Sequence, residues 1–259
     1  MDKGIEQHFR KEEQPFLDAA AGWAAEVEDR YAPKLTGFLD PRQRFIVRAV
    51  TGGRDLVIAE SGGLPDAERR RLLIAPPYLD AADEDFEITV MEVRYPVKFA
   101  DIGHRDVLGS ITGLGIDRSR FGDIRTGDGT IQFAADTALR DYMAANLTSI
   151  GKTKVRVSAL NDDSSLLAAT EEWEEMTVTV ASLRLDAVLA SVLNVSRQKS
   201  ASLVSSGRVK VNHAVRESPS FELSDSDLLS VRGHGRIRIG DIGGQTRKGR
   251  VRLEIGRLA

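Results

Sequence analysis

The sequence contains no cysteine, so the chain can form no disulfide, no thiolate nucleophile and no cysteine-ligated zinc or iron–sulfur site. Its four histidines are not spaced like metal ligands, and we expect neither a metal nor another cofactor. No apolar run approaches the roughly 20 residues that a membrane-spanning helix needs. The N-terminus is polar and mixed in charge, unlike a signal peptide. These absences favour a cytoplasmic protein without a membrane partner.

Positive charge is concentrated in the last third of the chain. Residues 182–259 carry 14 Lys and Arg against 7 Asp and Glu, a net charge of +7. Residues 1–181 carry 22 against 32, a net charge of −10. A basic segment on an acidic body predicts contact with a polyanion. The alternative is a solvated basic face that binds no ligand.

Turn residues and an acidic run divide the chain into three expected domains, at residues 1–80, 81–165 and 177–259. We expect an α+β protein whose first domain is an α/β segment. Residues 161–176 are polar and acidic and are expected to form a connector that could hold one strand. The elements predicted in the first domain are helix 5–30, helix 41–50 after Asp40-Pro41, strand 56–59, helix 66–72 and a strand from 73.

The central domain is predicted to have the order strand, helix, strand, strand, helix, strand. This is the order of a split-βαβ sandwich, similar to RNA-recognition sheets and also to many domains that bind no nucleic acid. The predicted elements are strand 86–95, helix 104–113, strands near 123 and 130–134, helix 137–147 and strand 154–158.

The densest motif of the central domain is GHRDVLGSITGLGIDRSRFGDI, at 103–124. His104-Arg105-Asp106 could serve acid–base chemistry, but the glycines have neither Walker nor dinucleotide-binding spacing. A structural strand–turn–helix and a contact with the RNA backbone both stay open. The candidate RNA contacts are His104, Arg105, Arg118 and Arg120.

The last domain begins with an amphipathic helix at 185–193. Ser196 is expected to cap a second helix, which ends near 206 with Gly207 as its C-terminal cap. Arg197 and Lys199 lie in the first turn of that helix, where the helix dipole and the side chains both favour a phosphate.

Beyond Gly207 the period becomes two. Arg208 and Lys210 are expected on one side of a strand, and strands at 231–239 and 251–255 repeat the alternation with Arg236, Arg238, Arg250 and Arg252. Like charges gathered on one face repel one another, so the arrangement favours an anionic ligand.

Four short segments resemble the S4 RNA-binding domain: LRLD at 183–186, Ser196-Arg197, GRVKVN at 207–212 and VRG at 231–233. The S4 family usually has glycine where this chain has His213, which puts the turn type in doubt. Arg184-Leu-Asp186 also resembles the catalytic motif of pseudouridine synthases, but there the aspartate lies in a separate domain after the S4 module. We therefore expect Asp186 to be a helix-start carboxylate. The RNA contacts that we predict here are Arg184, Ser196, Arg197, Lys199, Arg208, Lys210, Asn212, Arg232, Arg236 and Arg238.

Together with HFRKEEQPF, LTGFLDPRQRFI and GHRDVLGSITGLGI, this domain resembles the YlmH family over nearly the whole chain. The resemblance implies a role in cell division and in ribosome-associated quality control, with binding to a large ribosomal subunit that carries an obstructed peptidyl-tRNA.

We expect a monomeric, non-enzymatic protein that binds structured RNA by shape and by phosphate contacts, namely rRNA with tRNA as a further candidate, and not DNA. Two alternatives remain. One is an RNA-modifying enzyme with its site in residues 1–160 and an S4 targeting domain. The other is an interaction protein of the division machinery.

Overall fold

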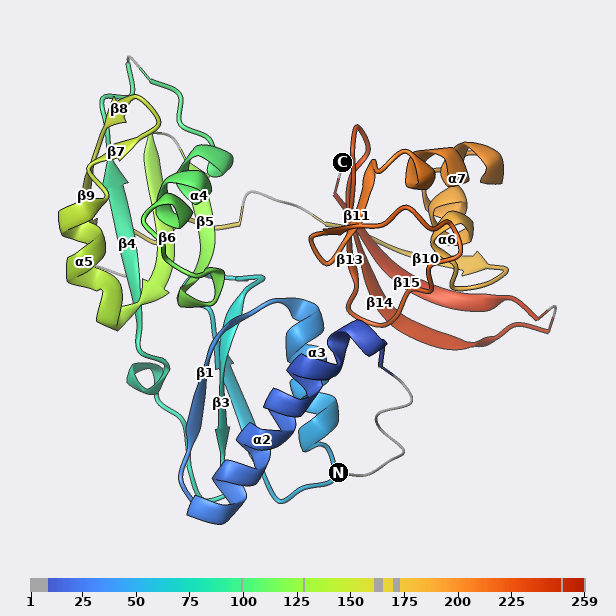
Figure 1. Ribbon diagram of the computed structural model, residues 1–259, viewed down its shortest axis with the longest axis horizontal. Helices are drawn as coiled ribbons and strands as arrows, with labels where there is room; N and C mark the ends of the chain where they lie inside the picture. Colours follow the sequence, from blue (N-terminus) through green and yellow to red (C-terminus); the bar gives the residue numbers. More distant parts are fainter. Residues whose placement is uncertain are drawn as a thin grey trace. The chain divides into compact units, whose positions relative to one another are not determined.

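The computed structural model describes residues 9–98, 100–127, 129–160, 165–169, 173–247 and 249–258 (Figure 1). The chain divides into two compact units, Met1–Ala169 and Thr170–Ala259, and each is treated by itself. Within the described ranges, no helix combines the length and the hydropathy that a bilayer crossing requires.

The first unit opens with a three-stranded sheet in the order β1-β3-β2, all antiparallel. The helices α2 and α3 cover one face of this sheet, where Leu17, Ile46, Leu72 and Ile74 share one core (Figure 1). Asp40 caps α3 as expected, because its Oδ1 accepts from the Gln43 amide at 2.8 Å. The elements are η1 Lys11–Glu13, α2 Gln14–Arg30, β1 Lys34–Leu39, α3 Pro41–Thr51, β2 Val57–Ser61 and β3 Arg70–Ala75.

One prediction for this sheet is wrong, and one of its strands was missed. The helix predicted at 66–72 is wrong, since β3 occupies its second half, and β1 was not predicted. The Ala, Glu and Arg of this stretch favour a helix locally, but β3 is the central strand and buries Leu72 and Ile74. Arg71 is buried beside them and donates from Nε to the Thr36 carbonyl at 2.8 Å. The start of the predicted helix 5–30 lies outside the described residues.

The second half of the first unit has the predicted strand–helix–strand–strand–helix–strand order, with the sheet order β5-β6-β4-β9. Met91 and Phe133 of the sheet share a core with Val107 of α4 and Met143 of α5, so both helices pack on one face. A small hairpin, β7–β8, was not predicted. The elements are η2 Asp83–Phe86, β4 Ile88–Arg94, α4 His104–Gly113, η3 Arg118–Arg120, β5 Phe121–Gly127, β6 Thr130–Asp136, η4 Thr137–Leu139, α5 Arg140–Asn146, β7 Ser149–Ile150, β8 Thr153–Lys154 and β9 Arg156–Ala159.

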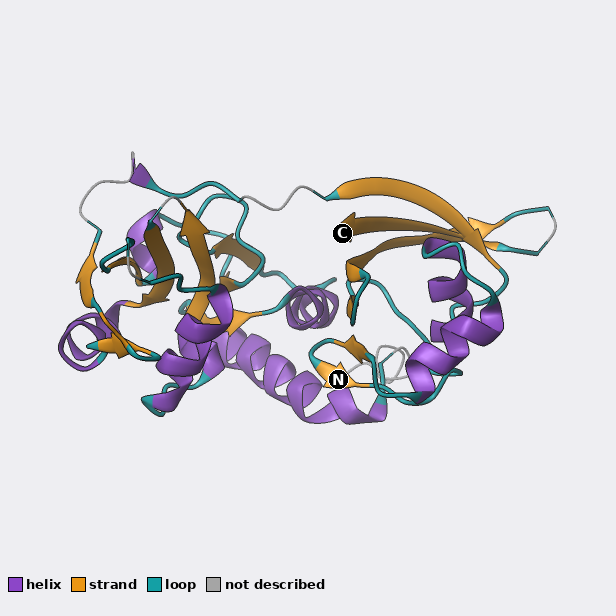
Figure 2. Cartoon of the chain, turned by 90° about the horizontal axis from the view of Figure 1, so that it is seen from above, coloured by secondary structure: helices purple, strands orange, loops and turns teal. Residues whose placement is uncertain are grey.

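In its described residues, the second unit consists of an antiparallel sheet and two helices, and the strand order of the sheet is β10-β15-β14-β13-β11-β12. The helices α6 and α7 lie on one side of this sheet (Figure 2), and Leu189, Val204, Val211 and Ile237 belong to the core between them. The elements are β10 Glu174–Val180, α6 Leu185–Val192, α7 Arg197–Ser205, β11 Val209–Val211, β12 Ala214–Val215, β13 Leu228–Val231, β14 Gly235–Gln245 and β15 Val251–Leu258.

The single strand predicted at 231–239 is wrong. Strand β13 ends at Val231 and β14 starts at Gly235, so the chain reverses between them. Gly233 and Gly235 have φ of 84° and 83°, which glycine adopts without strain. The alternation holds beyond the turn, where Ile237 and Ile239 are buried.

Candidate nucleic-acid interface

Helix α7 begins and ends as its sequence predicts. The Ser196 Oγ accepts from the Lys199 amide at 3.2 Å, which satisfies one of the free N–H groups of the first turn. At the other end Gly207 has φ of 69°, and the Arg208 amide donates to the Leu203 carbonyl at 3.2 Å. This Schellman-type ending turns the chain back toward the helix and brings Arg208 beside it.

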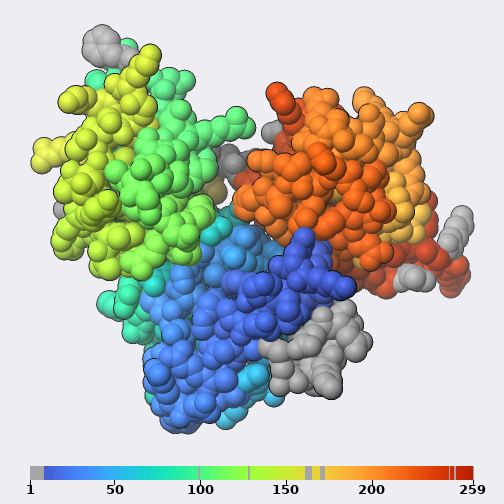
Figure 3. Space-filling view, viewed as in Figure 1, coloured from blue at the N-terminus to red at the C-terminus, as the bar shows by residue number. Residues whose placement is uncertain are grey.

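A shallow depression of about 440 Å³ lies along α7 and contains two of the predicted cations, Lys199 and Arg208. In the space-filling view the C-terminal unit presents its orange segments, which include α7, at the surface (Figure 3). The other residues that line the depression are mostly small and polar: Ser196, Gln198, Ser202, Leu203 and Ser206. An anion placed here would meet two cations and several hydroxyl and amide groups.

Asp186 joins two more predicted cations to this region. Its carboxylate accepts from Arg184 Nε at 3.1 Å and from Arg197 Nε at 3.1 Å. The second nitrogens of the two forks, both Nη2, lie at 3.3 and 3.5 Å. The Asp186 side chain is 6% exposed, whereas those of Arg184 and Arg197 are 39% and 54% exposed. One buried carboxylate therefore fixes two guanidinium groups that still reach solvent.

Burial alone would raise the pKa of Asp186, but hydrogen bonds from Arg184 and Arg197 outweigh it and hold the pKa below its usual value. The carboxylate is thus ionised at neutral pH. Asp186 is a helix-start carboxylate, as predicted, because it lies in the first turn of α6. We did not predict that Asp186 orders two arginines. The spacing of Arg184-Leu-Asp186 could have indicated the pairing with Arg184, but not the pairing with Arg197.

The side chain of Asn212 makes hydrogen bonds within the fold. Its Nδ2 donates to Asp227 Oδ1 at 2.8 Å, and its Oδ1 accepts from the Leu228 amide at 2.9 Å. Asn212 and His213 have φ of 48° and 68°, the two left-handed residues of a type I′ hairpin turn. Histidine therefore keeps the turn that the usual glycine would make. The side-chain amide of Asn212 therefore has two partners within the protein, and its role as an RNA contact stays a prediction.

The predicted cations of the strands come from several positions in the sheet and its turns. Arg232 lies in the turn after β13, and its amide donates to the Arg208 carbonyl at 2.9 Å. Lys210, by contrast, points away from the helices and pairs in register with Ser230, which pairs with Arg236. Arg208 lines the depression along α7, whereas Lys210 and Arg236 flank Ser230 on the sheet, and their gathering on one cationic face stays a prediction.

The outer surface of the sheet has its own internal contacts. The Arg236 and Arg238 guanidinium carbons lie 5.4 and 4.9 Å from the centre of the Trp173 ring. Arg238 also pairs with Glu175. A Cβ on Gly256 would lie 2.6 Å from Arg238 Nε, so the absent side chain lets Arg238 cross the sheet. These two arginines have partners within the protein, as Arg184 and Arg197 have, and their role as RNA contacts stays a prediction.

The predicted contacts of the central motif separate into two kinds. His104 and Arg105 are exposed at the start of α4, where Asp106 accepts from the Gly103 amide at 3.0 Å and so acts as a cap. Arg118 is turned inward: its Nη1 donates to the Phe121 carbonyl at 2.5 Å, and burial lowers its pKa to about 10. Arg120 pairs with Asp136 at 3.3 Å. His104, Arg105 and Arg120, whose side chain is 44% exposed, therefore lie at the surface, and Arg118 is the one of the four that is turned inward.

The helix-free face of the central sheet is partly covered by the chain itself. Gln132 is 1% exposed, donates to the Ser165 carbonyl at 2.9 Å and accepts from the Leu167 amide at 2.8 Å. Arg125, on the same face, donates to the Pro65 carbonyl. An RNA-recognition sheet stacks RNA bases on this face. Because the segments around Pro65 and Ser165–Leu167 cover part of it here, base stacking on this sheet is not favoured.

No group of three or more His, Asp or Glu side chains is placed to hold a metal ion anywhere in the described ranges.

The helix pair, the capped α7 and the hairpin that follows define an S4-domain protein: residues 183–229 match the family model described as "S4 domain". Two further models match, "YlmH, N-terminal" at residues 12–79 and "Putative RNA-binding domain in YlmH" at 81–164.

The chain is 43% identical over 253 residues to the "Ribosome-associated protein quality control protein P2" of Bacillus subtilis (strain 168), covering 98% of each chain. It also resembles the solved structure "Cell division protein ylmH from Streptococcus pneumoniae", with a TM-score of 0.54 and 32% identity, over 62% of this chain and 98% of that one. The chain belongs to the YlmH family.

Proposed function

We propose that this protein is a non-enzymatic factor that binds ribosomal RNA through the α7 surface and acts in ribosome-associated quality control. The observation that carries the proposal is the ordering of Arg184 and Arg197 by Asp186, next to the depression that Lys199 and Arg208 line. Planar guanidinium forks held in place on a polar surface suit phosphate oxygens, which they can contact in pairs. The ribosomal role is supported by the name of the Bacillus relative.

The finer proposal is that the target is the large ribosomal subunit with an obstructed peptidyl-tRNA. A-form RNA hides its base edges from side chains, so phosphate, sugar and shape would dominate the contact. Sedimentation of a cell extract tests the proposal, because the protein should travel with free large subunits and leave them as salt rises. Log affinity should fall by roughly 0.7–0.9 per phosphate contact for each unit of log salt. A protein that stays at the top of the gradient in dilute salt would contradict it.

A role in cell division is the second candidate, supported by the name of the Streptococcus structure. Isolation of the tagged protein with and without nuclease separates the two. The RNA proposal is wrong if the untreated sample contains no ribosomal components and the division proteins still co-purify after nuclease treatment. The domain limits 1–80, 81–165 and 177–259, the monomeric state and the cytoplasmic location stay predictions.

A further inference from the structure

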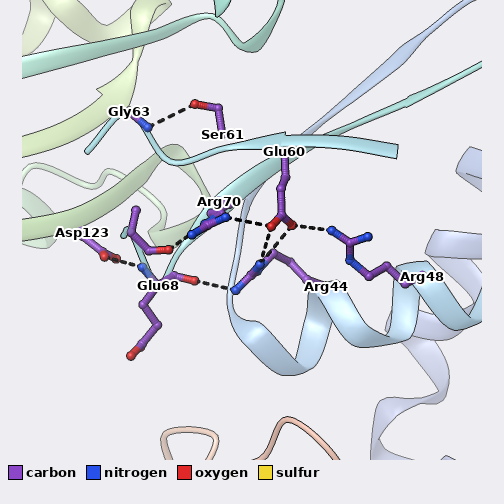
Figure 4. Close-up of polar contacts among 9 residues, drawn as sticks. Arg44, Arg48, Glu60, Ser61, Gly63, Glu68, Arg70 and Asp123 are labelled. Carbon is purple, nitrogen blue, oxygen red and sulfur yellow. Dashed lines mark hydrogen bonds and ion pairs between the residues drawn. The ribbon is translucent and has the colours of Figure 1, made fainter. Parts of the chain in front are cut away.

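The first unit contains a second carboxylate surrounded by arginines (Figure 4). Glu60 of β2 accepts from Arg44 Nη1 at 3.2 and 3.0 Å, from Arg48 Nη2 at 2.8 Å and from Arg70 Nη1 at 2.8 Å. Three guanidinium groups from two elements, α3 and β3, thus converge on one side chain of a third, β2.

The fold brings these residues together at one edge of the sheet. Glu60 pairs in register with Leu72, so both point to the face that the helices cover, and Arg70 lies two residues before Leu72 on that face. Strand β2 is an edge strand, and Arg44 and Arg48 lie one turn apart on α3. The cluster therefore sits where the α3 surface meets the sheet edge, beside open solvent.

The charges of this cluster do not balance. Burial alone would raise the pKa of Glu60, but hydrogen bonds and charge from Arg48 and Arg44 outweigh it and hold the pKa below its usual value. One negative and three positive groups leave an excess of two positive charges, within a segment whose net charge is −10. Like charges held this close repel one another unless an anion is added.

Several donors of the cluster have no protein partner among the described residues. Arg48 uses only Nη2, which leaves Nε and Nη1, and Arg70 uses Nε and Nη1, which leaves Nη2. The Arg48 side chain is 50% exposed, and Figure 4 shows the second nitrogen of its fork directed away from Glu60. These donors can reach an anion without displacing the carboxylate that orders them.

We propose that Arg48 and Arg70, held in place by Glu60, bind a backbone phosphate of RNA and form a second RNA contact in the N-terminal part of the chain. The planar donors fit phosphate oxygens. The buried core of a protein–protein interface is typically apolar and depleted of charge, and Val57 is the one large exposed hydrophobic side chain described on α3, β2 and β3, so the cluster fits RNA better than a protein partner. This inference rests on the proposed function, because the RNA would be the same ribosomal RNA that α7 contacts.

The test compares single variants of the full chain for binding to refolded total ribosomal RNA over a series of KCl concentrations. Arg48→Ala should weaken binding about three- to tenfold and reduce the slope of log affinity against log salt by about 1. Arg48→Lys should retain the slope but lose part of the affinity, since lysine has the charge without the fork. Melting temperatures of all variants establish that each is folded.

The matched control is Arg30→Ala. Arg30 is also a helix arginine of the first unit, exposed and paired at 2.9 Å with Glu26, which Lys34 also contacts. It should leave affinity and salt slope unchanged. Arg197→Ala is the reference for the proposed function and should weaken binding on its own.

If Arg48→Ala behaves like Arg30→Ala while Arg197→Ala loses affinity, the second contact is wrong and the proposed function stands. If no variant changes binding, or the parent chain does not bind the RNA, the proposed function fails as well. If Arg48→Ala leaves RNA binding intact but lowers association with ribosomes, the cluster meets a ribosomal protein and the RNA assignment is wrong.

Discussion

Asp186 and Glu60 are both carboxylates surrounded by more than one arginine, but Asp186 lies in a basic unit and Glu60 in an acidic segment. Each is a carboxylate that receives more positive charge than it can neutralise, two arginines for Asp186 and three for Glu60. The arginines around Asp186 are well exposed, in a unit that is basic overall. Those around Glu60 are mostly half-buried, with Arg44 only 17% exposed, in a segment that is acidic overall.

This difference indicates what each carboxylate does. Asp186 orders side chains that point outward, so it prepares a surface for a ligand and contributes modestly to stability. Glu60 connects α3 to the edge strand β2 and to β3, so it stabilises the fold while leaving one arginine, Arg48, half exposed. A mutation should therefore affect mainly binding at the first carboxylate and mainly stability at the second.

The largest expected effect is the loss of stability on replacing Glu60. Glu60→Gln leaves Arg44, Arg48 and Arg70 facing one another without a counter-charge and should lower the free energy of unfolding by about 2–3 kcal/mol. Asp186→Asn should cost about 1–2 kcal/mol, because its two arginines are better solvated. Urea unfolding of both variants measures the difference, and equal losses would contradict the comparison.

The lowered pKa of Glu60 also predicts how the stability of the protein depends on pH. The folded-state pKa of Glu60 is lowered, so its contribution to stability is complete above the ordinary glutamate pKa and is lost as the pH falls through the folded value. Glu60→Gln should therefore be less acid-sensitive than the parent chain. Unfolding measured between neutral and acidic pH should show the two curves converging at low pH.

An intermediate effect is expected on RNA binding at the Asp186 surface. Arg197→Ala should weaken binding by about 1–2 kcal/mol, yet change stability by no more than about 0.5 kcal/mol, because Arg184 still pairs with Asp186. Asp186→Asn tests ordering against charge: it adds a positive charge, but should reduce affinity about tenfold if the fixed geometry matters more. A tighter complex would show that net charge dominates.

The smallest effect is expected at the outer face of the S4 sheet. Arg238→Ala removes a half-exposed cation that already pairs with Glu175 and Trp173, so stability and RNA affinity should each change by less than about 0.5 kcal/mol. The fluorescence of Trp173, read in a Trp23→Phe background, should change because the ring loses a neighbouring charge. A large loss of RNA binding would place the interface on the sheet instead of on α7.

Local signals were sufficient for much of the S4 unit. Ser196 and Gly207 delimit α7 as predicted because a cap and a left-handed residue act on the neighbouring backbone. The hairpin between β13 and β14 was not predicted, because VRGHGRIRI alternates on both sides of its turn. Alternation reports which face a residue occupies and does not report where the chain reverses.

In the sheet of β1, β2 and β3, contacts between segments far apart in the sequence decided what could not be predicted. Strand β3 carries Arg70 and Arg71 before its apolar residues, and such a charged start resembles a helix until the partners are known. Those partners, the Thr36 carbonyl and Glu60, lie on other strands. The Glu60 cluster was missed for the same reason, since its members come from three elements and no short motif joins them. The Asp186 pairing was half visible, because Arg184 is two residues away and Arg197 is on the next helix.

The position of β15 has a consequence for the order in which the second unit can be completed during synthesis. Strand β15 lies between β10 and β14 in the sheet, although it follows both in sequence. Until Val251–Leu258 has been made, β10 has no neighbouring strand and β14 has an open edge toward the missing one. A nascent chain arrested before that point would expose two unpaired strand edges, which are sites of aggregation. A truncated translation product of this protein would therefore be prone to aggregate through these edges.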